Sequence, residues 1–287
     1  MSWLIFSLLN AFFDSASSAL GKRGAQKINV LSVTWAQRFF GLFIIIPLAI
    51  FNKSFQSVGS GFWLVLLASS SLITVASILF VKAIKDSPLS LTLPMTTFTP
   101  VLLLLTSPIM IGELPKPLGI AGVLSVVIGS YILNLSKRSN GFFEPIFALF
   151  KNQGSRLMLI VAIIWSVTTN FEKMLVKDSN PLFTSVASNV AVLIFLTLVL
   201  RIKKISIRNI LRNSKTLAPI GIFNGLSYAS QMTAYSMTLV ANVISVKRLN
   251  TLFGTLWGKI FFKEENIKER FAGAVIMVLG VILITLS

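Results

Sequence analysis

Long apolar runs separated by short polar or basic segments fill almost the whole chain of 287 residues. A membrane-spanning helix needs about 20 mostly apolar residues, and ten runs meet that requirement. Between them lie only short turns and two basic connectors, 136–156 and 201–215. The pattern predicts an all-α polytopic membrane protein with ten transmembrane helices. Their predicted ranges are 3–20, 30–51, 61–81, 89–110, 117–135, 157–176, 181–200, 216–239, 241–262 and 268–286.

The two halves of the chain match when one is shifted by 151 residues without a gap. Apolar helices match one another by chance, so the informative matches are polar or small residues that recur at this constant offset. They pair Lys22 with Lys173, Asn29 with Asn180, Lys53 with Lys204, Ala83 with Ala234, Glu113 with Glu264, Gly122 with Gly273, and Gly129 with Gly280. We therefore expect a first five-helix repeat at 1–136, a basic connector at 137–156 and a second five-helix repeat at 157–287.

Each predicted repeat has an odd number of helices, and this determines how the two repeats lie in the membrane. The second must enter the bilayer in the direction opposite to the first, so we expect an inverted repeat. Inverted repeats place a substrate site near the bilayer midplane, and rocking of the halves exposes that site to each side in turn. The architecture favours a secondary transporter that works by alternating access.

The amino-acid composition argues against a soluble enzyme. Charged residues make up 12% of the chain, about half of the ~25% that is typical of soluble domains, and His and Cys are absent. Without thiol or imidazole groups, the usual zinc ligands and the commonest general base are missing. We therefore expect neither an enzyme nor a bound metal or cofactor. The net charge of +17 is attributed to Lys and Arg at the membrane boundaries and not to nucleic-acid binding.

In each half, a Glu follows the fourth predicted helix, within Ile111-Gly-Glu113-Leu and Phe262-Lys-Glu264-Glu, and an Ala-Gly-x6-Gly helix comes next. Together with the two five-helix halves, these motifs resemble the ten-helix EamA-type members of the drug/metabolite transporter superfamily over essentially the whole chain. The resemblance implies a transporter fold. It does not specify the cargo, because the superfamily includes amino-acid and drug exporters, nucleotide-sugar transporters and sugar-phosphate exchangers.

The distribution of basic residues predicts an orientation. Connections after odd-numbered helices hold 16 of the 26 Lys and Arg, and connections after even-numbered helices hold three. The positive-inside rule places the odd-numbered connections in the cytoplasm and both termini outside, whereas the family resemblance implies both termini inside. The two predictions conflict. In either case we expect a multi-pass protein of the plasma (inner) membrane.

Lys247 and Arg248 lie about six residues inside the ninth predicted helix. A Lys or Arg at the bilayer centre costs about 2.5–3.5 kcal/mol, so we expect the pair to face inward, with snorkelling to the interface as the alternative. The pair also resembles the Lys-Arg with which sugar-phosphate exchangers of the superfamily hold phosphate, which implies an anionic cargo. Those exchangers have another Lys in helix 4, where this chain has the uncharged segment 91–100. A carboxylate or a zwitterion therefore stays open.

Thr96 and Thr97 occupy the positions of this Lys-Arg pair in the first repeat, and a proline lies on either side of them. Proline kinks a helix, and the freed carbonyls are tolerated beside a cavity. We expect helix 4 to bend beside the site, with a kink for packing alone as the alternative.

The eighth predicted helix has a polar stripe at helical spacing, and the third has a thinner one. Gln231 and Tyr235 are the preferred pocket residues of the first stripe, with hydrogen bonds that only join helices as the alternative. The residues of the two stripes are Asn224, Ser227, Tyr228, Gln231, Tyr235 and Thr238, and Ser70, Thr74 and Ser77.

Asp14 and Arg38 are further polar groups at depth, and Asp14 is taken as the only carboxylate within a predicted span. An ion pair between the two would explain both. Otherwise, Asp14 is the candidate for proton coupling and Arg38 a second anion ligand. Glu113 and Glu264 are expected to favour the positive N-terminal end of the next helix. The paired glycines are expected to serve helix packing or a dimer face.

The sequence thus predicts a secondary active transporter of a small organic solute, with a preference for phosphorylated or carboxylate cargo. A broad amino-acid or drug exporter is the alternative within the same class, and a non-transporting scaffold or lipid-handling protein is the alternative outside it. The expected partners are the solute, the lipid bilayer, a proton or counter-substrate, and a second copy of the chain as a homodimer. No nucleic-acid partner is expected.

Overall fold

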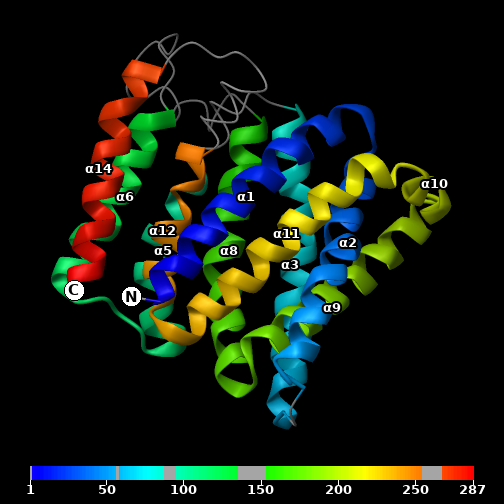
Figure 1. The fold of residues 1–287 in the computed structure, drawn as a ribbon, viewed down its shortest axis with the longest axis horizontal. Helices are drawn as coiled ribbons and strands as arrows, with labels where there is room; N and C mark the ends of the chain where they lie inside the picture. The colour runs from blue at the N-terminus through cyan, green and yellow to red at the C-terminus, as the bar shows by residue number, and fades with distance from the viewer. Residues whose placement is uncertain (1, 56–57, 87–94, 135–152, 254–266) are drawn as a thin grey trace.

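The computed structural model describes residues 2–55, 58–86, 95–134, 153–253 and 267–287, and the regular elements in these ranges are helices (Figure 1). The helices are α1 (Ser2–Lys27), α2 (Val30–Phe51), α3 (Ser60–Asp86), α5 (Phe98–Ile111), α6 (Pro117–Asn134), α8 (Gln153–Asp178), α9 (Pro181–Ile202), α10 (Ile207–Arg212), α11 (Ser214–Met237), α12 (Val240–Lys247) and α14 (Ile267–Leu286). Helices α1, α2, α3, α8 and α9 are long and apolar enough to cross a membrane.

The observed helices follow the predicted spans, and the differences lie mainly at the ends. α1 continues to Lys27, past its predicted end at residue 20, because the small residues Gly21, Gly24 and Ala25 pack in the interior. The fourth and ninth spans are each interrupted within the described residues. Helical residues 95–96 precede α5, which begins at Phe98, and helical residues 250–253 follow α12, which ends at Lys247. The remainder of these two spans, 89–94 and 254–262, lies outside the described residues.

Local backbone features recur at the offset of 151 residues. The Asn29 side chain caps α2 by accepting the Leu31 N–H, and in the second repeat Asn180 caps α9 by accepting the Leu182 N–H, both at 2.9 Å. After α2 and α9, Lys53 and Lys204 adopt positive φ angles of 48° and 54°, the left-handed conformation that commonly ends a helix. The predicted division of the chain at 137–156 stays a prediction, with α8 beginning at residue 153.

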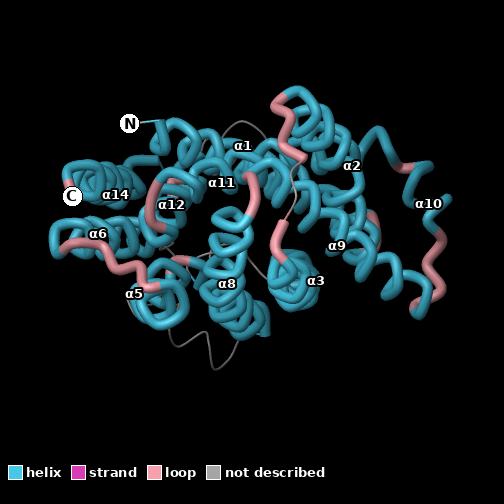
Figure 2. Tube along the Cα trace, turned by 90° about the horizontal axis from the view of Figure 1, so that it is seen from below, coloured by secondary structure: helices cyan, strands magenta, loops and turns pink. Residues whose placement is uncertain are grey.

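The helices of one repeat pack against those of the other. α1 lies on α11 and α8 on α3, whereas α2 pairs with α9 and α6 with α14 (Figure 2). Trp35 Nε1 donates to Thr197 Oγ1 at 2.9 Å. Arg38 comes later than Trp35 in α2, but its partner Asn189 comes earlier than Thr197 in α9. The direction along α2 is therefore opposite to that along α9, its repeat partner, as an inverted repeat requires.

Paired glycines bring α6 and α14 together. A Cβ atom on Gly122 would lie 2.7 Å from the Gly280 carbonyl oxygen, and one on Gly129 would lie 2.7 Å from that of Gly273. Backbones approach this closely only where side chains are absent. The expected role of these glycines in helix packing is confirmed, because they face each other within one chain, and the homodimer stays a prediction.

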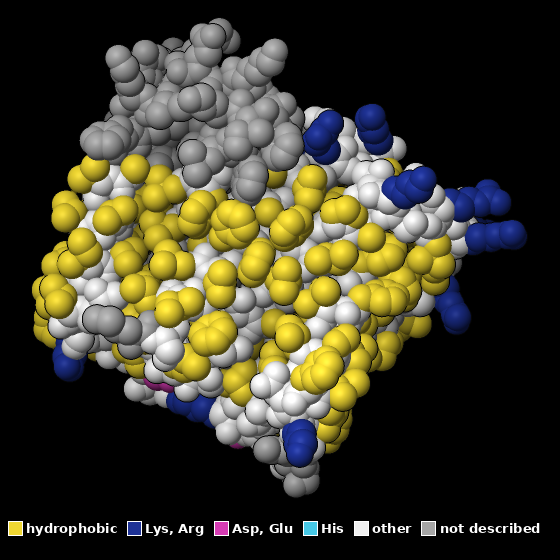
Figure 3. Space-filling view, viewed as in Figure 1, with side chains coloured by type: hydrophobic (Ala, Val, Ile, Leu, Met, Phe, Trp, Pro, Cys, Tyr) yellow, Lys and Arg dark blue, Asp and Glu magenta, His cyan; other side chains and the backbone are white. Residues whose placement is uncertain are grey.

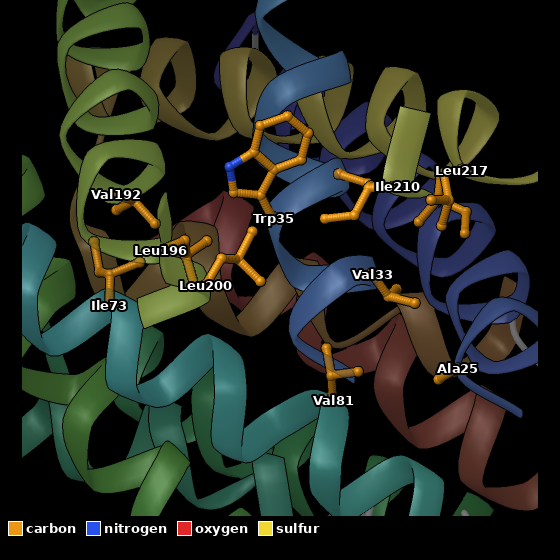
Figure 4. Close-up of a cluster of buried hydrophobic side chains, with 12 residues drawn as sticks. Ala25, Val33, Trp35, Ile73, Val81, Val192, Leu196, Leu200, Ile210 and Leu217 are labelled. Atoms are coloured by element: carbon orange, nitrogen blue, oxygen red, sulfur yellow. The ribbon is translucent and has the colours of Figure 1, made fainter. Parts of the chain in front are cut away.

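Apolar side chains cover the outside of the bundle as well as its interior. Figure 3 shows a broad hydrophobic surface with Lys and Arg at its margins, and Phe43, Ile109 and Leu279 are each more than half exposed. Inside, Trp35 of α2 packs with Leu196 of α9 and other buried residues (Figure 4). An apolar exterior around buried polar groups is the arrangement of a membrane protein, and the fold is all-α and polytopic.

Candidate functional site

A polar network centred on Gln231 of α11 lies inside the bundle, where α11 contacts α1, α8 and α12. The Gln231 Oε1 atom accepts hydrogen bonds from Lys247 Nζ at 2.8 Å and Asn10 Nδ2 at 3.2 Å. Its Nε2 atom donates to the Tyr235 hydroxyl at 2.8 Å and to Glu172 Oε2 at 3.4 Å. Asn10 belongs to the first repeat and the other four residues to the second, so this central network joins the repeats.

Lys247 forms an ion pair with Asp14, with Nζ and Oδ1 3.3 Å apart. Asn250 Nδ2 donates to the other carboxylate oxygen at 2.7 Å. The predicted ion pair between Asp14 and Arg38 is therefore wrong. α1 carries Asp14 onto α11 and α12, whereas Arg38 lies on α2 and contacts residues of α3 and α9.

Glu172 of α8 is a second carboxylate in the network, so the expectation that Asp14 is alone within the spans is wrong. Its side chain is buried, and Oε1 accepts a hydrogen bond from the Tyr228 hydroxyl at 2.5 Å. Glu172 is not among the predicted site residues, although it lies within the predicted span 157–176. A Glu inside a membrane span is itself a signal of a functional site, because its charge is costly there.

Arg38 lies at the far end of the network. Its guanidinium donates to Asn189 Oδ1 at 3.3 Å and to Ser77 Oγ at 3.2 Å, and lies 5.4 Å from the centre of the Tyr228 ring. Asn189 is the repeat partner of Arg38, so this contact lies where the repeats meet. Tyr228 connects Arg38 to Glu172, and the role of Arg38 as an anion ligand stays a prediction.

Arg248 is a buried cation whose hydrogen bonding is incomplete. Its residue exposure is 3%, and its enclosed Nε atom has no hydrogen-bond partner in the described part of the chain. Its charge interacts electrostatically with Asp14. Arg248 follows the last turn of α12, where helix carbonyls favour a positive charge. An incompletely paired buried charge is costly, so this position suits an anionic ligand.

Thr96 and Thr97 are buried at an interruption of the helix before α5. In the second repeat the helix is interrupted at Arg248 and Leu249, where the N–H groups bond three residues back at 3.0 and 2.9 Å. Thr97 and Arg248 are repeat partners, and α5 packs against α12. Discontinuous helices form the substrate sites of several inverted-repeat transporters. The two threonines as substrate ligands stay a prediction.

A second polar cluster lies near the ends of α5, α8 and α11. Glu113 is 3.0 Å from Lys177 and 3.5 Å from Lys173, and it accepts the Val240 N–H at 3.3 Å. Lys173 also donates to the backbone carbonyls of Tyr235 and, at 2.8 Å, Thr238. Glu113 therefore contacts the N-terminal end of α12 and not, as expected, that of the next helix along the chain. Its repeat partner Glu264 lies outside the described residues.

The apolar shell, the inverted pairing of helices and the buried charged network define a polytopic membrane protein of the transporter class. The model of the EamA-like transporter family matches the chain twice, at residues 1–135 and 152–286. The chain belongs to this family, whose members are membrane transporters of small solutes.

The fold is also similar to that of a solved structure. A solved structure described as "Crystal structure of protein" has a TM-score of 0.77 and 16% sequence identity, covering 99% of this chain and 96% of that chain. At that identity, the likeness shows the fold alone. No curated protein matches the chain.

Proposed function

We propose that the chain is a secondary active transporter that moves a small organic anion, carboxylate or phosphorylated, by alternating access. The central network is its binding site, with Lys247, Arg248, Gln231 and Tyr235 as the residues closest to the cargo. The single observation that carries the proposal is Arg248, a buried guanidinium whose Nε atom lacks a hydrogen-bond partner within the described residues. A carboxylate or phosphate supplies the acceptors that an Arg fork requires.

Alternating access is supported by the way in which the network joins the repeats. Asn10 and Asp14 come from the first repeat, and they contact Gln231 and Lys247 of the second. A relative movement of the repeats therefore changes the contacts of the site itself. Asp14 is the proposed coupling residue, since its side chain is 23% exposed and holds Lys247 directly.

The experiment is a thermal-stability screen of the purified full chain in detergent, with carboxylates, phosphorylated compounds, zwitterions and cations. A ligand that binds only the folded state raises its stability. We expect anions to stabilise the wild type and to lose this effect in Arg248→Gln. In the absence of ligand, we expect Arg248→Gln to be as stable as the wild type or more stable, because it removes an incompletely paired buried charge.

Arg212→Gln is the matched control, because Arg212 is an exposed residue in the last turn of α10. It should retain the stabilisation by anions. Stabilisation by zwitterions or cations that survives in Arg248→Gln would contradict the proposal and favour an amino-acid or drug exporter. The absence of any stabilising solute would favour a scaffold.

A further inference from the structure

The central network, together with the adjoining Arg38 and Arg248, contains more positive than negative charge. Arg38, Lys247 and Arg248 are its described cations, and Asp14 and Glu172 are its described carboxylates. Each carboxylate has a hydrogen-bond donor or a cation at both of its oxygens, an arrangement that fits the ionised form. One positive charge therefore remains uncompensated in this part of the chain.

The nearby charged groups of the second cluster do not alter this balance. Lys173 follows Glu172 in sequence, but its amino group points to backbone carbonyls and pairs with Glu113. Lys177 also pairs with Glu113, and about half of its side chain is exposed to the surroundings. These charges are compensated among themselves or at the surface.

We propose that the central network selects a cargo with a single negative charge, such as a monocarboxylate, and that Glu172 sets this selectivity. The assignment rests on the proposed function and narrows it. A monoanion brings this group of charges to neutrality, whereas a dianion leaves an excess negative charge and a cation adds to the positive one. Uncompensated charge is costly in the membrane interior, so each mismatch lowers affinity.

Glu172 is the group best placed to reject a second negative charge. It is more buried than Asp14, and its carboxylate attracts both Arg38 and Lys247 electrostatically. Through Gln231, it is two hydrogen bonds away from the Lys247 amino group. A cargo with a second anionic group near these cations meets the fixed charge of Glu172, and like charges brought together without water repel strongly.

The test compares matched monocarboxylates and dicarboxylates, from acetate and malonate to benzoate and phthalate, by the stabilisation that each gives to the purified full chain. We expect the wild type to bind the monoanion of each pair more tightly. In Glu172→Gln, we expect the preference to shift toward the dianion by roughly tenfold or more, because the repelling charge is gone. Glu172→Asp keeps the charge and should keep the wild-type preference.

Asp14→Asn is a second variant that removes a negative charge at a different place in the network. It should shift the preference in the same direction, so the test does not depend on the folding of one variant. An unchanged ratio of affinities in both variants overturns the charge-selectivity assignment while leaving an anion site intact. A wild type that binds neither member of any pair overturns the proposed function itself.

Discussion

At the scale of single residues, the two carboxylates of the central network have different partners, and the tasks proposed for them differ accordingly. Asp14 bonds directly to Lys247 and to Asn250, and it is partly exposed. Glu172 is enclosed by Tyr228 and Gln231. A group that exchanges protons with water needs access to water, and a fixed counter-charge does not. Asp14 therefore suits coupling, and Glu172 suits selectivity.

The coupling role predicts a change in the pH dependence of transport. Protonation of Asp14 removes its attraction for Lys247, so we expect a proton gradient to drive accumulation of the stabilising anion in proteoliposomes. In Asp14→Asn, gradient-driven accumulation should fall by roughly tenfold or more, while exchange across equal pH persists. Asp178→Asn, an exposed residue at the end of α8, is the control. Unaltered pH dependence in Asp14→Asn would remove Asp14 from the coupling step.

Site residues could be predicted from the sequence where a polar or charged side chain lies in the membrane interior, because burying it there costs free energy. Lys247, Gln231 and Tyr235 were identified by charge or by polar spacing at depth, and the structure brings all three together. Glu172 carries the same kind of signal, a charged side chain within a predicted span, but it is not among the predicted site residues. The predicted ion-pair partner of Asp14, Arg38, was wrong for a different reason. The spacing of residues along one helix does not reveal which other helix lies opposite.

At the scale of elements, the cluster of Glu113, Lys173 and Lys177 connects three separate segments. Glu113 follows α5, both lysines lie on α8, and Lys173 binds the carbonyls at the end of α11. The last carbonyls of a helix have no partner within it, so the Lys173 amino group satisfies groups that would otherwise be unpaired. The cluster thus fixes the turn between α11 and α12, which leads to Lys247.

Lys173 should contribute more to stability than Lys177, although both pair with Glu113. Lys173→Met leaves buried carbonyls without a donor, which costs roughly 1–3 kcal/mol. Lys177→Met removes a half-exposed ion pair worth about 1 kcal/mol or less. We expect a clearly larger fall in the thermal unfolding midpoint for Lys173→Met, measured in detergent. Equal effects of the two substitutions would show that the carbonyl contacts of Lys173 contribute nothing.

The elements themselves were largely predictable, because the bilayer fixes the length of an apolar helix. The interruption at Thr97 lies within the bend predicted between Pro94 and Pro100, whereas the interruption at Arg248 was not predicted. Proline beside Thr97 indicated a bend in the first repeat, whereas no proline lies near Arg248. There, the backbone N–H groups of Arg248 and Leu249 bond three residues back, a tighter turn that no proline in the local sequence signals.

At the scale of the whole molecule, the inverted pairing of the repeats places equivalent connections on opposite sides. In Figure 1, the two chain ends lie close together, and the charge count places the basic connections opposite them. The connection 201–215 is rich in Lys and Arg, whereas the connection between α2 and α3 has only Lys53. The positive-inside rule therefore predicts that 201–215 faces the cytoplasm.

The absence of Cys from the sequence makes this orientation directly measurable. Asn52 and Asn209 are exposed residues, at the end of α2 and within α10. In intact cells, a membrane-impermeant maleimide should label Asn52→Cys and leave Asn209→Cys unlabelled, whereas permeabilised cells should label both. The charge asymmetry between the two connections is the physical reason, since translocating many Lys and Arg across the membrane is disfavoured. The reverse labelling would place both termini in the cytoplasm, as the family resemblance implies, and would mean that the basic connections are translocated against the charge rule.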